Sequence, residues 1–264
     1  MEAVRVADMN EEQLRAWVAA GGDLAERNVL EALRNPYCTV GVAEAIADRP
    51  DLLGAHTVRE LLSSFRGLAF ARVMDLVATL PWTSLLTLAQ NPRTPPMVGR
   101  HAEKKLVALL ARMSLGEKVA LARRAHRPLL RPLIEAGDCQ VLAALLDNQR
   151  LSENDVLLIL NIAAAPAEFY GELARHHRWG QSYAVRSALV RCAHAPLPVA
   201  LSALVQLRSS DLEAVASRPD VPEPVRTAAA ALKEKEDKGL RRVIKYPTHD
   251  SRSDPAACEP EVLR

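Results

Sequence analysis

The chain has 264 residues, of which 49% are apolar and 4% aromatic, and its formal net charge at pH 7 is +2. This length and apolar content are enough to bury a sizeable core, which excludes a chain that is disordered throughout. No stretch is apolar over the roughly 18 residues of a membrane span, and the N-terminus lacks the basic start and apolar run of a signal peptide. We therefore expect a cytoplasmic globular protein.

Leu and Ala dominate the apolar residues, and both favour helices. Few segments alternate polar residues with Val, Ile, Thr or Tyr, as half-buried strands do. The composition therefore predicts an all-α fold.

The first predicted helix follows Asn10, with the sequence NEEQLRAWVAA. Asn10 is placed to cap it, and Gly21 and Gly22 are placed to end it. We interpret residues 1–30 as N-terminal capping helices, because the end unit of a repeat array must present a polar face to solvent.

A similar turn then recurs down the chain. Each copy follows a helix that ends in Leu-Ala or a similar pair, and each opens with Asn or a basic residue. Thr94 is expected to cap the next helix with Pro95 in its first position, and Ser152 to cap together with Asp155. The copies begin at Asn35, Asn91, Arg124, Asn148, His176, His194 and Arg218.

The spacing of these turns predicts the architecture. After Asn91 it averages about 25 residues, and the longer gap from Asn35 to Asn91 has room for two units, with a degenerate turn near the sequence SFRGLAF. Two short helices per unit cannot bury their apolar faces alone, but stacked units can. The pattern favours a right-handed α-solenoid over residues 31–232, of the HEAT/armadillo-like kind; the alternative is a plain helical bundle with proline-rich loops.

The segments NPRTPPMV and VASRPDVPEPVRTAAA resemble the turn-and-helix phrases of bacterial leucine-rich repeat variant and HEAT-like proteins. In that family Asn-Pro-x-Thr-Pro follows a helix ending in Leu-Ala, and Val-Arg precedes a run of Ala. The resemblance covers roughly residues 30–232 and implies a single solenoid domain over residues 1–232 with a habit of binding other molecules, but no reaction. Variant repeats can carry an iron–sulfur cluster on clustered cysteines; here only Cys38 lies near the start, so no cofactor is implied.

The four cysteines are far apart and form no CxxC pair or zinc-binding pattern. We expect reduced thiols and no metal site. Beyond residue 232 the helical pattern gives way to a charged segment, in which we expect a few helical turns to about Lys238. Residues 233–264 as a whole are predicted to form a charged, largely disordered tail.

Basic residues are concentrated between residues 100 and 131, where nine basic side chains stand against two acidic ones. In a solenoid they could align as a ridge that attracts phosphate groups or acidic segments. The alternative is an ordinary solvated face. The candidate basic ridge consists of Arg100, Lys104, Lys105, Arg123, Arg124, Arg127 and Arg131.

A second cluster interleaves aromatic and basic residues. Such side chains could stack on bases or grip a peptide, but they could equally fill a core junction in an irregular unit. The adjacent histidines are not expected to share a metal, because neighbours on a regular helix point about 100° apart. The candidate aromatic–basic patch consists of Tyr170, His176, His177, Arg178, Trp179 and Tyr183.

No GxSxG, P-loop, HExxH or glycine-rich nucleotide motif is present, so we expect no enzyme and no catalytic residues. The leading hypothesis is a non-catalytic protein–protein interaction module or scaffold. The alternative is a nucleic-acid-binding protein, such as a HEAT-like DNA-repair glycosylase, with Trp82 or Trp179 near the base. The partner is then another protein, or nucleic acid or an acidic segment held by the basic ridge.

Overall fold

The computed structural model describes residues 5–21, 24–161 and 165–239. Every regular element within these ranges is a helix, which confirms the all-α fold. The described residues divide into two compact units, with the boundary between Leu151 and Ser152. Among the described residues, no helix is long and apolar enough to cross a membrane.

The described part of the first unit consists of short helices joined by turns. Two of them are 3₁₀ helices, η1 (Val6–Asp8) and η2 (Leu52–Gly54). The α-helices are α1 (Glu11–Ala20), α2 (Glu26–Arg34), α3 (Val40–Ala47), α4 (His56–Ser64), α5 (Phe70–Ala78), α6 (Trp82–Gln90), α7 (Pro96–Leu109), α8 (Leu115–Arg124), α9 (Arg127–Glu135) and α10 (Cys139–Leu146).

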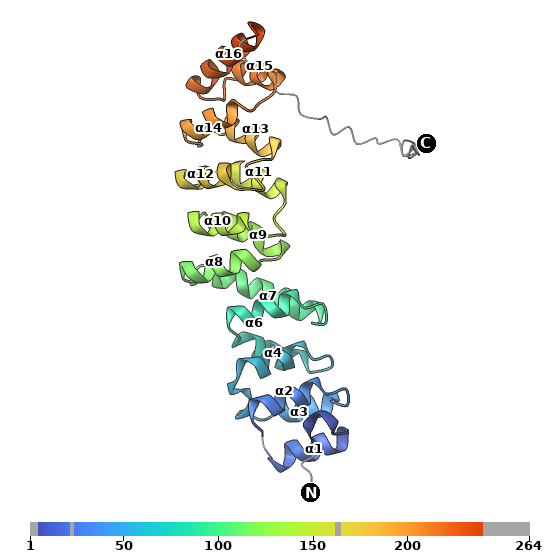
Figure 1. The fold of residues 1–264 in the computed structure, drawn as a ribbon. Helices are drawn as coiled ribbons and strands as arrows, with labels where there is room; N and C mark the ends of the chain where they lie inside the picture. Colours follow the sequence, from blue (N-terminus) through green and yellow to red (C-terminus); the bar gives the residue numbers. More distant parts are fainter. Residues whose placement is uncertain (1–4, 22–23, 162–164, 240–264) are drawn as a thin grey trace, which may run out of the picture. The chain divides into compact units, whose positions relative to one another are not determined.

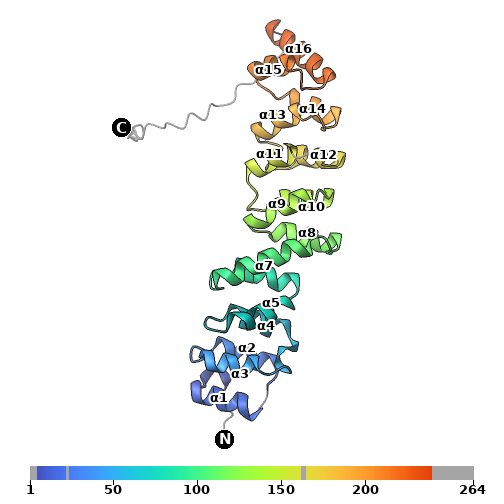
Figure 2. The same cartoon turned by 180° about the vertical axis from the view of Figure 1, so that it is seen from behind.

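Within this unit the helices pack in two rows. In one row α2 contacts α4, α4 contacts α6, and α8 contacts α10; in the other, α1 contacts α3, α5 contacts α7, and α7 contacts α9. Figures 1 and 2 show the pairs following one another in chain order from blue to green. The core lies between the rows, and its fully buried side chains include Leu14, Ile46, Leu62, Leu85, Leu106 and Leu129.

The second unit is built in the same way. Helix α11 contacts α13, which contacts α15, while α12 contacts α14 and α14 contacts α16. Phe169 and Tyr170 are its largest fully buried side chains. The helices are α11 (Glu153–Asn161), α12 (Ala167–Arg175), α13 (Tyr183–Arg191), α14 (Leu197–Leu204), α15 (Ser209–Ser217) and α16 (Glu223–Asp237).

Several predicted helix ends are confirmed. Asn10 caps α1 in a capping box with Gln13, and Gly21 ends that helix in a left-handed conformation with φ of 63°. The Ser152 hydroxyl accepts a 3.3 Å hydrogen bond from the Asp155 N–H and so caps α11. The degenerate turn also exists: α4 ends at Ser64 and α5 begins at Phe70, so two helix pairs fill the longer gap.

The prediction that Thr94 caps a helix beginning at Pro95 is wrong. Helix α7 begins at Pro96, and Pro95 is its N-cap residue, with φ of −54° and ψ of 134°. The reason is steric, because the proline ring at position 96 disfavours a helical backbone at the preceding residue. Thr94 is buried, and its hydroxyl has no hydrogen-bond partner among the described residues.

Helix α16 extends to Asp237, five residues into the segment predicted as the charged tail. The prediction of disorder for residues 240–264 lies outside the described residues, and so does the expectation that Cys258, the last of the four cysteines, is a reduced thiol. The single domain predicted over residues 1–232, including capping helices over 1–30, stays a prediction.

Replacing Asn10 by alanine is expected to lower the free energy of unfolding by about 1 kcal/mol. The Asn10 side-chain oxygen accepts a 2.9 Å hydrogen bond from the Gln13 N–H, and the Gln13 side-chain oxygen accepts a bond of the same length from the Asn10 N–H. Alanine removes the first of these bonds and leaves a helix N–H without it. Urea denaturation followed by circular dichroism measures the change. An Asn10→Asp control keeps the acceptor and should unfold like the wild type.

Candidate functional site

The recurring Asn residues hold the turns of the first unit. The side-chain oxygens of Asn35, Asn91 and Asn148 each accept a hydrogen bond from the backbone N–H two residues further on, over 2.8, 2.9 and 2.8 Å. At His176, in the second unit, ring atom Nδ1 accepts the equivalent bond over 3.3 Å. Asn suits this position because its short side chain can bond to its own backbone two residues on.

The amide groups of these Asn residues differ in what they contact. The amide of Asn148 donates to the carbonyls of Ala122 and Ala125 over 2.7 and 2.9 Å. The amide of Asn35 donates to three backbone carbonyls around η1, over 2.9, 3.2 and 3.0 Å. The Asn91 amide donates no hydrogen bond to any residue that the structure describes. Asn91 therefore lacks the side-chain hydrogen bond to the preceding turn that Asn148 makes.

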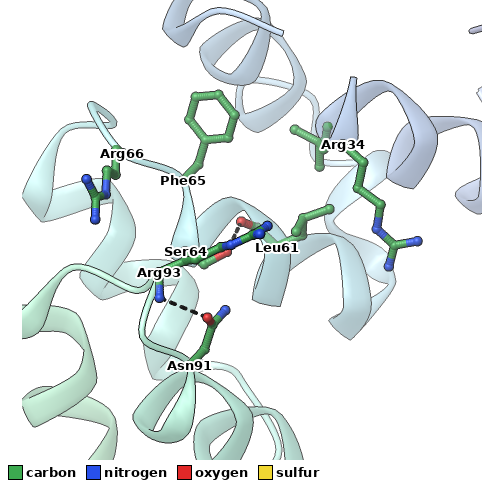
Figure 3. A pocket seen from close by; sticks show the side chains of 8 residues that line it. Arg34, Leu61, Ser64, Phe65, Arg66, Asn91 and Arg93 are labelled. Carbon is green, nitrogen blue, oxygen red and sulfur yellow. Dashed lines mark hydrogen bonds between the residues drawn. The ribbon is translucent and has the colours of Figure 1, made fainter. Parts of the chain in front are cut away.

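A cleft of about 770 Å³ opens beside Asn91, between the C-terminal ends of α2, α4 and α6 (Figure 3). In Figure 3 the Asn91 oxygen faces the Arg93 N–H, and its nitrogen points the other way. We call this cavity the first arginine cleft. Its lining residues are Leu33, Arg34, Leu61, Ser64, Phe65, Arg66, Asn91 and Arg93.

The first arginine cleft is cationic. Arg34, Arg66 and Arg93 come from three successive turns, and no Asp or Glu is among the residues that line the cavity. A carboxylate, that of Glu60, lines a smaller cavity that shares Arg34, Leu61, Ser64 and Asn91 with the first. Within the described residues none of these three side chains forms an ion pair, whereas Arg49 and Arg72 pair with Asp51 and Asp48. Guanidinium groups suit carboxylates and phosphates because their N–H groups can donate in pairs. The cavity is therefore suited to an anionic ligand.

A second cleft of about 340 Å³ lies between the ends of α6, α8 and α10. Arg123, Arg124 and Arg150 line it, together with Asp147. The Gln90 side chain bridges two of these ends by donating a 2.7 Å hydrogen bond to the carbonyl of Arg124. Because a carboxylate is present and the cavity is smaller, this second arginine cleft has a weaker preference for anions than the first.

The structure divides the candidate basic ridge. Arg123 and Arg124 line the second cleft, while Arg100 and Lys104 lie exposed on α7, and Arg127 and Arg131 lie exposed on α9. The Arg131 guanidinium donates to Glu135 over 2.9 Å, which offsets its charge. The ridge is therefore not one row of equivalent cations.

Lys105 does not belong to an exposed ridge. Its side chain is half-buried, and the ammonium group donates hydrogen bonds to the carbonyls of Val77 and Ala78, near the end of α5. Burial lowers the pKa of this ammonium group. Lys105 thus caps α5, because cations are favourable beside the carbonyls at a helix C-terminus.

The large aromatic residues of the aromatic–basic patch belong to the core. Tyr170 and Trp179 are 1% and 3% exposed, so they fill a junction between helices, as the alternative interpretation held. Burial raises the pKa of the Tyr170 hydroxyl to about 12, since the charged phenolate is disfavoured away from water. The Arg178 guanidinium lies 4.0 Å from the Trp179 ring centre and covers it. These rings are not available to a base or a peptide.

The two histidines depart from the predicted geometry. Their ring centres lie 4.5 Å apart with an angle of 31° between the planes. The expectation that the rings diverge assumed a regular helix, but His176 ends α12 with an extended backbone. Among the described residues no group of three or more His, Cys, Asp or Glu side chains could hold a metal ion.

Tyr183 has a structural role in the second unit. Its hydroxyl donates to Asp211 and accepts a 3.2 Å hydrogen bond from the Arg208 N–H, which ties α13 to the start of α15. The Arg208 guanidinium lies 4.8 Å from the ring centre. Burial, followed by the hydrogen bond to Asp211, raises the pKa of the Tyr183 hydroxyl.

Sequence reasoning missed Arg34, Arg66 and Arg93 as site residues. Each stands alone among uncharged neighbours, and the three are separated by a whole unit, so no local cluster marks them. The available signal was positional: each lies on or beside a copy of the recurring turn. Stacking the turns would have brought them together.

The chain was compared with family models, curated proteins and solved structures. No family model matches it, and neither a curated protein nor a solved structure does. The geometry of the described residues therefore carries the functional proposal alone.

Proposed function

We propose that the chain is a non-catalytic α-solenoid interaction module that binds an acidic segment of another protein at the first arginine cleft. The carrying observation is that three successive turns bring Arg34, Arg66 and Arg93 around one cavity without a carboxylate. All three side chains are exposed, so an anionic ligand can reach their guanidinium groups. Acidic side chains can pair with these groups through charge-assisted hydrogen bonds.

The repeat architecture is part of the proposal. It is supported by the two rows of helices in each unit and by the equivalent bonds that Asn35, Asn91, Asn148 and His176 make in their turns. A stacked array places successive turns along one edge, where each contributes side chains to an extended ligand.

Substituting Gln for all three arginines of the first cleft is expected to weaken binding of a labelled all-glutamate peptide at least about tenfold. The substitution removes the charges but keeps side chains of similar length at exposed positions, so the fold should persist. Fluorescence anisotropy with the full chain at moderate salt measures the affinity.

The matched control is Arg100→Gln with Lys104→Gln and Arg131→Gln. It removes the same number of positive charges from exposed positions that do not line the cleft. The control should bind the peptide within about twofold of the wild type, since salt screens distant charges. Equal losses in both variants would mean that the peptide responds to net charge alone, and would refute a defined site.

Nucleic-acid binding is the second candidate. The observation that favours it is the exposure of Arg100, Lys104 and Arg127 on α7 and α9. If it is correct, duplex DNA binds the wild type at low salt, and the control variant loses that affinity while the cleft variant keeps it. A glycosylase-type reaction has less support from Trp179, which is buried and cannot contact a displaced base. It would depend on Trp82, which is half-buried at the start of α6.

A further inference from the structure

The first arginine cleft lies at the degenerate turn between α4 and α5, since Ser64, Phe65 and Arg66 line it. At the end of α8 the carbonyls of Ala122 and Ala125 accept the amide of Asn148. Counting back from the C-cap residue, the equivalent carbonyls at the end of α4 belong to Leu62 and Phe65. Among the described residues, Asn91 donates to neither of them. The array therefore leaves an unused donor and a cavity at the same place.

The cavity has apolar as well as cationic walls. Leu33, Leu61 and Phe65 line it beside the arginines. A ligand that only supplied negative charge would leave these surfaces in contact with water, whereas a ligand with an apolar side chain would cover them.

Exposed apolar residues also lie on the turns that carry Arg34 and Arg66. Tyr37 is 62% exposed and Phe70 is 55% exposed. Val40 ties the two turns together, since a Cβ atom on Gly67 would lie only 2.6 Å from its Cγ2 atom. We call Tyr37, Val40 and Phe70 the apolar rim. These residues do not line the cleft, but Tyr37 and Phe70 lie three and four residues along the chain from the lining residues Arg34 and Arg66. Large exposed apolar groups are typical of protein-binding surfaces.

We propose that the first arginine cleft and the apolar rim together bind an extended peptide in which acidic and apolar residues alternate, with the Asn91 amide donating to a peptide carbonyl. This inference rests on the proposed function and specifies its ligand. Extended chains present successive side chains on opposite faces, so carboxylates can reach the arginines while apolar side chains cover the rim. A backbone carbonyl of the peptide supplies the acceptor that the Asn91 amide lacks among the described residues.

The charge around the cleft favours a short peptide over a long polyanion. Residues 1–60 contain 11 acidic and six basic residues, so this part of the chain carries a net negative charge. That field repels the phosphates of nucleic acid or of an anionic membrane, which extend beyond the cavity. A peptide that places its carboxylates inside the cleft meets the arginines locally.

The test compares two labelled peptides of equal length, one of glutamate alone and one in which glutamate alternates with phenylalanine. The wild type is expected to bind the alternating peptide about tenfold more tightly, as burial of one aromatic side chain would give. A Tyr37→Ser, Phe70→Ser double variant should lose that preference but still bind the all-glutamate peptide. A Val205→Ser control, which changes an exposed apolar residue of the second unit, should keep the preference.

An Asn91→Ala variant tests the amide. It should bind the alternating peptide about tenfold more weakly than the wild type while keeping its helix content by circular dichroism. Unchanged affinity in this variant would refute the role of Asn91.

The remaining outcomes separate this inference from the proposed function. Equal affinity of the wild type for both peptides, with both lost in the triple arginine variant, would overturn the inference and leave the proposed function standing. Failure of both peptides to bind the wild type would overturn both. Binding of the wild type to phosphatidylserine vesicles, without binding to either peptide, would also overturn both if the Tyr37→Ser, Phe70→Ser variant loses the vesicle binding.

Discussion

Replacement of Asn148 by alanine is expected to lower the free energy of unfolding by about 3 kcal/mol. The side chain is 2% exposed and makes three hydrogen bonds with the backbone. Its amide reaches two carbonyls at the end of α8, and its oxygen accepts the Arg150 N–H. Alanine leaves these buried groups without partners, and each unsatisfied group costs about 1–3 kcal/mol before local rearrangement. Urea denaturation followed by circular dichroism measures the loss.

The matched control is Asn91→Ala, the same substitution at the equivalent turn. Asn91 is only half-buried and makes one such bond, to the Arg93 N–H. We expect this variant to lose about 1 kcal/mol or less. Equal losses at positions 91 and 148 would show that the Asn residues stabilise only their own turns, and that the bonds between turns contribute little.

Replacement of Gly180 by alanine is expected to destabilise the second unit by about 3 kcal/mol. A Cβ atom at this position would lie 2.3 Å from the carbonyl oxygen of Ala174 and 2.8 Å from that of His176. Both are backbone atoms, so the turn must move to admit the methyl group. The turn is held by a 2.8 Å bond from the Gly180 N–H to His176 and carries the buried Trp179. Movement there would disturb the core junction.

Gly171 provides the control for this substitution. It lies within α12, and a Cβ atom would be no closer than 3.5 Å to the flexible end of Arg175. Gly171→Ala should therefore stabilise the protein by up to about 1 kcal/mol, because alanine favours the helical backbone. Thermal unfolding followed by Trp fluorescence compares the two variants. A Gly180→Ala protein as stable as the wild type would contradict the close backbone approach.

The sequence of the turns predicted much of what the structure contains. The all-α class follows from composition, and the periodic Asn-containing turns locate three helix ends: Asn35 and Asn91 are the C-cap residues of α2 and α6, and Asn148 directly follows the C-cap residue of α10. These features are local, since an Asn side chain bonds to its own backbone two residues on and a helix must end there. The exception, Thr94, is also local, because Pro96 disfavours a helical backbone at Pro95 and so moves the start of α7 by one residue.

The candidate sites were predicted less well, because the fate of a charged or aromatic side chain depends on its neighbours in space. Lys104 and Lys105 are adjacent lysines, yet the Lys105 ammonium group bonds to the end of α5 while the Lys104 side chain is exposed to solvent. Trp179 follows His176, His177 and Arg178 along the chain, and Tyr170 lies between Glu168 and Glu172, but both are buried in the core. Composition alone does not distinguish these outcomes.

What the sequence by itself determined is the succession of short helices and the turn that Asn35, Asn91 and Asn148 each close. What only the tertiary structure decided is which of these turns connects to the one before it. The amide of Asn148 reaches the preceding turn and that of Asn91 does not. That difference depends on the course of a neighbouring turn some 26 residues away in the chain, at Phe65. The physical reason is that an Asn amide bonds only to a carbonyl within about 3 Å, a distance that packing, not local sequence, sets.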